Sequence, residues 1–159
     1  MRWKSVVSLG ATGALVVTAI AVAGGLDPSA RCAGRSATVF GTPGSDRILG
    51  TSGPDVMVAR GGNDRLFGLA GNDVICGGSG RDLIAGGDGR DLLRGAAAGD
   101  TVRGEDGSDR LIGGSGHDRL NGGGDRDRLE GGSGRDLLIG GGGRDYCDQG
   151  SAGRAVSAC

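Results

Sequence analysis

Aromatic residues and histidine are scarce in this chain of 159 residues, which has four aromatic side chains and a single histidine, His117. A conventional core of large side chains is therefore not expected. The chain also has no surplus of basic residues, with 18 Lys and Arg against 19 Asp and Glu. This balance argues against a nucleic-acid partner. No Cys-x-x-Cys motif occurs, which removes the usual zinc and redox signatures.

The N-terminal segment has the pattern of an export signal. Arg2 and Lys4 precede an apolar stretch at 6–22, which ends in the small-residue cleavage pattern Ala-Val-Ala at 21–23. The sequence therefore predicts a signal peptide at 1–23 and a secreted, extracellular protein. This segment would be the only contact of the chain with a membrane.

A second interpretation of this segment stays open at the level of sequence. Residues 5–26 are just long enough to remain as an uncleaved membrane anchor. The glycine and threonine residues inside the stretch favour cleavage instead.

Export would permit disulfide bonds among the four cysteines, which allow three pairings. Pairing Cys32 with Cys76 and Cys147 with Cys159 would fasten both ends of the chain. We expect this arrangement, although spacing alone does not establish the pairing.

The main feature of the sequence is a period of nine residues over 41–148. Twelve aspartates recur at this spacing without a slip: Asp46, Asp55, Asp64, Asp73, Asp82, Asp91, Asp100, Asp109, Asp118, Asp127, Asp136 and Asp145. A fixed period in a glycine-rich chain with 38 Gly indicates a repeat architecture and not disorder.

Each unit has the pattern G-G-x-G-x-D-x-(Leu/Ile/Val)-x, with the aspartate at position six. Position one is Gly except for Ala59, and position four is Gly except for Ala98 and Asp125. Position eight is almost always aliphatic, and we expect it to form the core. We interpret the glycines as turn residues with backbone angles closed to other residues.

This pattern predicts an all-β fold, a parallel β-roll (β-solenoid). The first six residues of a unit are expected to form a turn and the last three a short strand, so that two units of nine complete one coil of 18 residues. The flanks 24–40 and 149–159 are expected to cap the roll, because Val39 and Val156 continue position eight without an aspartate beside them.

Stacking would bring the aspartates of units n and n+2 face to face along one edge, about 4.8 Å apart. Carboxylates at that spacing repel each other, and a divalent cation removes the conflict. The donors would be carboxylate and backbone carbonyl oxygens, which favour calcium over zinc or copper. Ion pairs with neighbouring arginines, such as Arg81 and Arg90, are the alternative for a minority of sites.

The repeat resembles that of the RTX, or haemolysin-type, calcium-binding nonapeptide family, clearest in Gly77–Ala85, Gly113–Asn121 and Gly131–Ile139. The resemblance covers 41–148 and implies a right-handed parallel β-roll whose GGxGxD turns hold several Ca²⁺ ions between coils. It implies that the twelve position-six aspartates are the metal ligands.

The functional prediction is a secreted calcium-binding β-roll whose folding is coupled to the ion. No constellation of catalytic residues is present, so the chain is not expected to be an enzyme, and His117 is expected to be a solvated turn residue. The alternative is an extracellular adhesion or cell-envelope interaction protein that uses the roll as a spacer. We also expect the substitutions Ala59 and Ala98 to weaken the ion sites beside them, whereas Asp125 either weakens its site or adds a carboxylate ligand to it.

Overall fold

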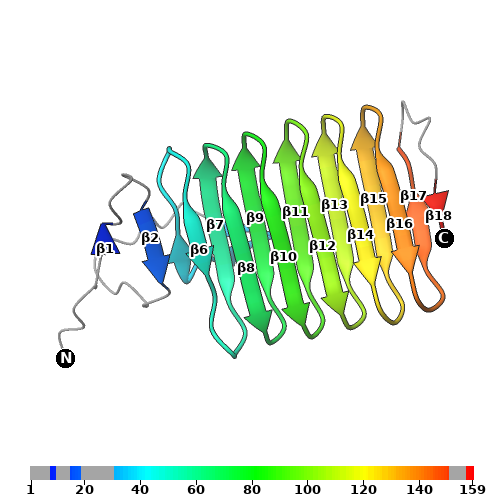
Figure 1. Cartoon of the computed structure of the whole chain (residues 1–159), viewed down its shortest axis with the longest axis horizontal. Coiled ribbons are helices and arrows are strands. Elements are labelled where there is room, and N and C mark those ends of the chain that lie inside the picture. The colour runs from blue at the N-terminus through cyan, green and yellow to red at the C-terminus, as the bar shows by residue number, and fades with distance from the viewer. Residues whose placement is uncertain (1–7, 10–14, 19–30, 151–156) are drawn as a thin grey trace.

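The computed structural model describes residues 8–9, 15–18, 31–150 and 157–159 of the chain. These residues form strands, turns and no helix, so none of them belongs to a helix that is able to cross a membrane. Figure 1 shows the strands stacked side by side along the long axis, with turns along two opposite edges. The all-β prediction is confirmed.

Two parallel sheets carry the repeats. The first sheet contains, in spatial order, β1 (Ser8–Leu9), β2 (Leu15–Thr18), β6 (Arg47–Leu49), β8 (Arg65–Ala70), β10 (Leu83–Asp88), β12 (Thr101–Asp106), β14 (Arg119–Gly123), β16 (Leu137–Gly141) and β18 (Ser157–Ala158). The second contains β5 (Val39–Phe40), β7 (Val56–Gly61), β9 (Val74–Ser79), β11 (Leu92–Ala97), β13 (Arg110–Ser115), β15 (Arg128–Ser133) and β17 (Tyr146–Asp148). All neighbours among the repeat strands β5 to β17 pair in parallel, whereas β1 pairs with β2 antiparallel.

The register of the sheets confirms two units per coil. Leu83 pairs with Thr101 in the first sheet and Leu92 pairs with Arg110 in the second, an offset of 18 residues in both. Successive units therefore alternate between sheets, and the chain forms a β-solenoid of the expected β-roll type.

The division of each unit into turn and strand differs from the prediction. Most strands hold six residues, from position seven of one unit to position three of the next, as in β8. Only positions four to six form the turn. The residues at positions one and two of the next unit, usually glycines, are thus part of the strand. Their backbone groups continue the pairing with the neighbouring coil.

The core is a single file of position-eight side chains between the two sheets. These side chains are at most 1% exposed in units one to eleven, and Val39 continues the file at the N-terminal end. The file consists of Ile48, Met57, Leu66, Ile75, Ile84, Leu93, Val102, Leu111, Leu120, Leu129 and Leu138, with Cys147 packed against it. The sequence prediction of the core is confirmed.

Both ends of the roll carry a disulfide. A short hairpin of β3 (Arg31–Cys32) and β4 (Arg35–Ser36) contacts β7 and β9, and Cys32 bonds to Cys76 on β9. At the C-terminal end, Cys147 bonds to Cys159. Both pairings agree with the expectation from the sequence.

The expected export signal is only partly within the described residues. β2 pairs in parallel with β6, so that Val17 lies opposite Ile48. The predicted cleavage pattern at 21–23 lies outside the described residues, as do Arg154 and Val156 of the C-terminal flank.

Candidate metal site

The position-six aspartates form two rows, one along each edge of the solenoid. We call the aspartates of odd units the odd row: Asp46, Asp64, Asp82, Asp100, Asp118 and Asp136. Those of even units form the even row, at the lower edge of Figure 1: Asp55, Asp73, Asp91, Asp109, Asp127 and Asp145. Each closes a turn directly before a strand. Eleven are buried, with 1–7% of their surface exposed, and Asp145 at the C-terminal end is half-buried.

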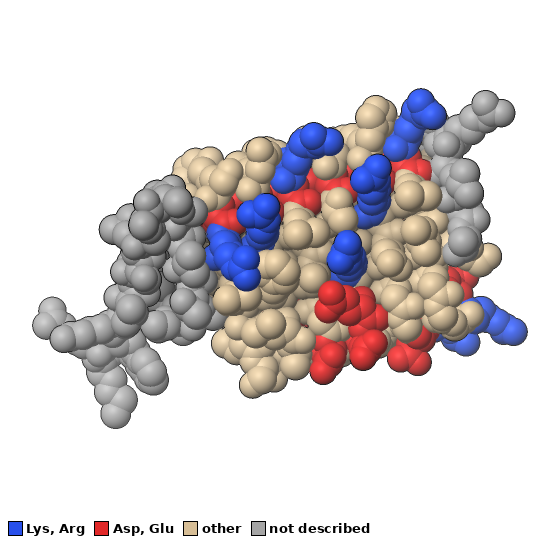
Figure 2. Space-filling model, in the orientation of Figure 1, with Lys and Arg blue, Asp and Glu red and all other residues tan. Residues whose placement is uncertain are grey.

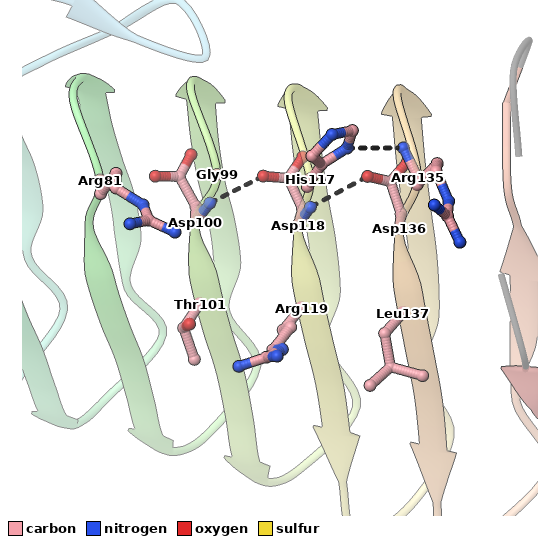
Figure 3. A pocket seen from close by; sticks show the side chains of 10 residues that line it. All are labelled: Arg81, Gly99, Asp100, Thr101, His117, Asp118, Arg119, Arg135, Asp136 and Leu137. Atoms are coloured by element: carbon pink, nitrogen blue, oxygen red, sulfur yellow. Dashed lines mark hydrogen bonds between the residues drawn. The ribbon is translucent and has the colours of Figure 1, made fainter.

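One carboxylate oxygen of every row aspartate from Asp64 to Asp145 joins successive coils. The backbone N–H of Asp100 donates to Oδ1 of Asp118 over 2.8 Å, and that of Asp118 donates to Oδ1 of Asp136 over 3.0 Å (Figure 3). The same bond recurs along both rows with lengths of 2.7–3.0 Å. The predicted approach of units n and n+2 is thus present, with a backbone amide bridging each pair.

The second carboxylate oxygen has no partner in the interior of the roll. Oδ2 is buried without a hydrogen bond in nine consecutive units: Asp64, Asp73, Asp82, Asp91, Asp100, Asp109, Asp118, Asp127 and Asp136. In the first two units, by contrast, Oδ2 accepts a bond from the backbone N–H of Thr42 or Thr51, at 2.6 and 2.7 Å. Buried polar atoms are nearly always paired, so nine consecutive unpaired Oδ2 atoms are suited to binding a proton or a cation.

Burial raises the pKa of these carboxyls. The pKa of Asp100 and Asp109 rises to about 7, mainly through desolvation and further through the charges of their row neighbours, although the backbone hydrogen bond lowers it. The pKa of Asp73, Asp82 and Asp127 rises to about 6 for the same leading reason. At neutral pH the rows therefore hold carboxylates that a bound cation would stabilise.

The arginines beside the rows do not supply that cation. Arg90, Arg126 and Arg144 precede even-row aspartates, yet their guanidinium groups form no ion pair with any described residue. Arg110 and Arg128 pair with Glu130, at 3.0 and 2.7 Å. The alternative of neutralisation by arginine is thus unsupported at these five positions.

Glycine is favoured at three positions of the unit, for two different reasons, although other residues such as Arg60 and Leu69 also adopt positive φ at position two. Positions two and four have positive φ, for example +112° at both Gly78 and Gly80. Position one does not, and there a Cβ would collide with the aspartate of its own unit, as at Gly86 with Oδ2 of Asp91.

The expectation that position one needs positive φ is therefore wrong, and Ala59 is not strained in that way. Ala59 is fully buried and belongs to the hydrophobic core cluster. Ala98 and Asp125 at position four do adopt positive φ, at 77° and 67°.

A row of carbonyl oxygens runs beside each row of aspartates. The position-four carbonyl oxygen of one coil lies against the Cα of the same position in the next coil, as Gly71 O does against Gly89. In units three to eleven these oxygens accept no hydrogen bond from a described residue. The turns thus offer carbonyl oxygens in addition to the orphaned carboxylate oxygens.

The donor set fits a hard cation. No three side chains of His, Cys, Asp or Glu converge among the described residues. An ion would therefore be bound by carboxylate oxygens of successive coils together with backbone carbonyls. Oxygen-only coordination with adaptable geometry suits calcium better than a transition metal.

His117 lies exposed in an odd-edge turn, as predicted. It lines a hollow of about 470 Å³ with Asp100, Asp118 and the arginines Arg81 and Arg135 (Figure 3). Its Nδ1 accepts a hydrogen bond of 3.0 Å from the backbone N–H of Arg135. Asn63 makes the same bond to Arg81, so position five carries a second chain of bonds between coils, which the repeat pattern did not reveal.

Sequence reasoning also missed a group of acidic side chains beside the even row. Asp88 lies opposite Asp106 in adjacent strands of the first sheet, and Glu105 precedes Asp106. Figure 2 shows acidic side chains gathered at the lower edge of the face that is in view. Burial is the main cause of the raised pKa of Asp91 and Asp109, and the charges of Glu105 and Asp125, respectively, raise it further. The signal that was available in the sequence is the placement of these four acidic residues two to four positions before an even-row aspartate.

The stacked coils and the two buried carboxylate rows define a parallel β-solenoid with oxygen-lined turns. The family model of the RTX calcium-binding nonapeptide repeat (4 copies) matches residues 40–75, 67–102, 76–111, 95–129 and 121–151. These matches cover well over half of the chain, and the chain therefore belongs to this family of calcium-binding β-roll proteins. Comparisons with curated proteins and with solved structures found no match.

Proposed function

We propose that the two aspartate rows are the calcium sites of this protein and that ion binding drives its folding. The observation that carries the proposal is the run of nine buried Oδ2 atoms without a partner. Each such atom costs free energy in the folded, metal-free chain, whereas an ion beside it would replace the lost hydration.

Calcium is expected to bind between successive coils of each row. The carbonyl oxygens of the position-four residues supply further ligands there. Asp46 and Asp55 differ, because threonine groups already satisfy their Oδ2 atoms. The strongest sites are thus proposed for the nine interior units.

The protein is proposed to act outside the cell, as a binding or structural module without catalysis. Two disulfides support an oxidising compartment, as does the export-like segment at 1–23. Millimolar calcium, typical for extracellular modules, would keep the roll folded there.

Circular dichroism of the purified protein tests this proposal. We expect the chain to be largely unordered in chelator and to gain β-structure as calcium reaches millimolar concentrations, because glycine-rich units lose much entropy on folding. Magnesium at the same concentration is the control and should be much less effective, since it demands tighter octahedral geometry. A spectrum that calcium leaves unchanged would refute ion-coupled folding.

A further inference from the structure

The charge balance of this chain depends on the aspartate rows. Its 18 basic and 19 acidic residues give a net charge of −1, and twelve of the acidic residues are the row aspartates. Without them, 18 basic residues face only seven acidic ones. Because each calcium ion adds two positive charges, filling the rows turns a nearly neutral chain into a strongly basic one.

Five arginines lie beside the even row, on the side of the second sheet. A groove of about 670 Å³ there is lined by Arg90, Arg110, Arg126, Arg128 and Arg144 together with Tyr146. All five arginines are exposed. A second hollow with Arg35, Arg90 and Arg110 extends the arginine-lined surface toward the N-terminal end.

The even row forms part of the wall of the same groove. Asp91, Asp109, Asp127 and Asp145 line it between the arginines. Without metal, their carboxylates repel an anion that enters the groove. With calcium beside them, the sign of the local charge reverses while the arginines stay where they are.

The arginines keep their hydrogen-bonding capacity for a ligand. Arg90, Arg126 and Arg144 form no ion pair with a described residue, and Glu130 is the partner of both Arg110 and Arg128. Three planar guanidinium forks are thus available to carboxylate or sulfate groups. Arg126 and Arg144 come from successive coils, about 4.8 Å apart along the axis, and Arg90 lies two coils before Arg126.

We propose that this groove binds a linear acidic polysaccharide, and that it does so only when the rows hold calcium. The inference rests on the proposed calcium sites and adds a partner to them. A polysaccharide is favoured over single-stranded nucleic acid, because the groove has one aromatic ring, and Arg128 already covers it at 4.9 Å. Nucleic-acid channels use rows of rings on which bases stack.

The distribution of acidic residues determines on which side of this edge a polyanion can bind. Asp88, Glu105 and Asp106 lie at the same edge of the solenoid but belong to strands β10 and β12 of the first sheet. They repel a polyanion from that side. The polymer is therefore held on the flank of the second sheet, along the axis of the roll.

Heparin, a sulfated polysaccharide, is the probe that tests this proposal. Binding of the whole protein to immobilised heparin is measured at constant ionic strength in calcium, in magnesium and in chelator. We expect binding in calcium and at least about tenfold weaker binding in the other two. Equal binding in chelator would overturn the calcium switch.

A pair of matched variants locates the surface. Arg126→Gln/Arg144→Gln should weaken heparin binding in calcium about tenfold or more, whereas Arg65→Gln/Arg103→Gln removes the same charge from the first sheet and should change it less than about threefold. Equal losses in both variants would overturn the groove as the binding surface.

Two further measurements separate the possible failures. Calorimetry with calcium alone tests the proposed ion sites in the same preparation. Calcium binding without heparin binding would sink the polysaccharide inference and leave the calcium sites intact, whereas absence of calcium binding would sink both. A single-stranded DNA oligonucleotide that binds as tightly as heparin would overturn the choice of a polysaccharide.

Discussion

The backbone N–H of Asp100 donates a hydrogen bond of 2.8 Å to Oδ1 of Asp118, 18 residues further along the chain. This bond fixes the aspartate side chain of one coil against the backbone of the preceding coil. It leaves Oδ2 of Asp118 buried and unpaired. One carboxylate thus has a structural oxygen and an oxygen that is free for a ligand, and the repeat copies this arrangement along both edges.

Acid should partly replace calcium in folding the metal-free chain. The pKa of several row aspartates rises from 3.8 to about 6 or 7 in the folded state, chiefly because burial disfavours the charge. Between about pH 4 and 7 the folded chain then binds more protons than the unfolded chain, and its stability falls as pH rises through this window.

After removal of metal, the β-sheet signal in circular dichroism should therefore be larger at pH 5 than at pH 8. In the presence of calcium the trend should reverse, because protons compete with the ion for the same oxygens. A metal-free chain whose spectrum is identical at both pH values would contradict the burial of ionised carboxylates.

The even row should bind calcium more tightly than the odd row. Asp91 has glycine at positions one and four of its unit and Glu105 nearby, whereas the unit of Asp100 carries Ala98 with φ of 77°. A non-glycine residue in this conformation costs about 1 kcal/mol, which corresponds to a several-fold change in affinity.

We expect Asp91→Asn to lower calcium affinity more than Asp100→Asn, as measured by calorimetry. Asparagine keeps the Oδ1 acceptor in both variants, so that the comparison isolates the charge. The opposite order would show that neither turn glycines nor the extra carboxylates decide where ions bind tightly.

The aliphatic file should carry most of the packing energy. Leu111 is fully buried between the two sheets, and Leu111→Ala should lower the free energy of unfolding in calcium by about 2–5 kcal/mol. Leu137→Ala, on the outer face of β16 at 37% exposure, is the control and should cost far less. Denaturant titration measures both, and equal costs would argue against a single-file core.

The disulfides should differ in their effect on stability. Cys32–Cys76 closes a loop with a sequence separation of 44 residues, and Cys147–Cys159 closes one of 12. The loss of each disulfide should cost about 2–4 kcal/mol, with the larger cost for the longer loop. Denaturant titration of Cys32→Ser/Cys76→Ser and Cys147→Ser/Cys159→Ser in calcium tests the order, and a larger loss in the second variant would contradict it.

The sequence predicted the solenoid because its period has physical meaning at every position. Leu66 and Ile84 recur at position eight and are stacked in the core, and Asp64 and Asp82 recur at position six and are bonded to each other. The core and the two aspartate rows were therefore accessible from the sequence.

What the sequence did not reveal depends on contacts between coils. The role of position one follows from the approach of Gly86 to the Asp91 carboxylate, which no propensity of glycine indicates. The arginine groove likewise results from coiling, because the fold brings Arg90 and Arg126 together across 36 residues. The balanced net charge concealed this surface, since eleven of the 19 acidic residues are buried aspartates of the two rows.

The central claim is that the orphaned Oδ2 atoms of the interior aspartates hold calcium. A crystal structure of the calcium-loaded protein, with anomalous data to locate the ions, tests it most directly. The account predicts two lines of anomalous peaks, each peak beside an Oδ2 atom between Asp64 and Asp136, with the Oδ1 bonds between coils retained. Oδ2 atoms that instead contact arginine guanidinium groups, with the calcium peaks elsewhere or absent, would contradict the account.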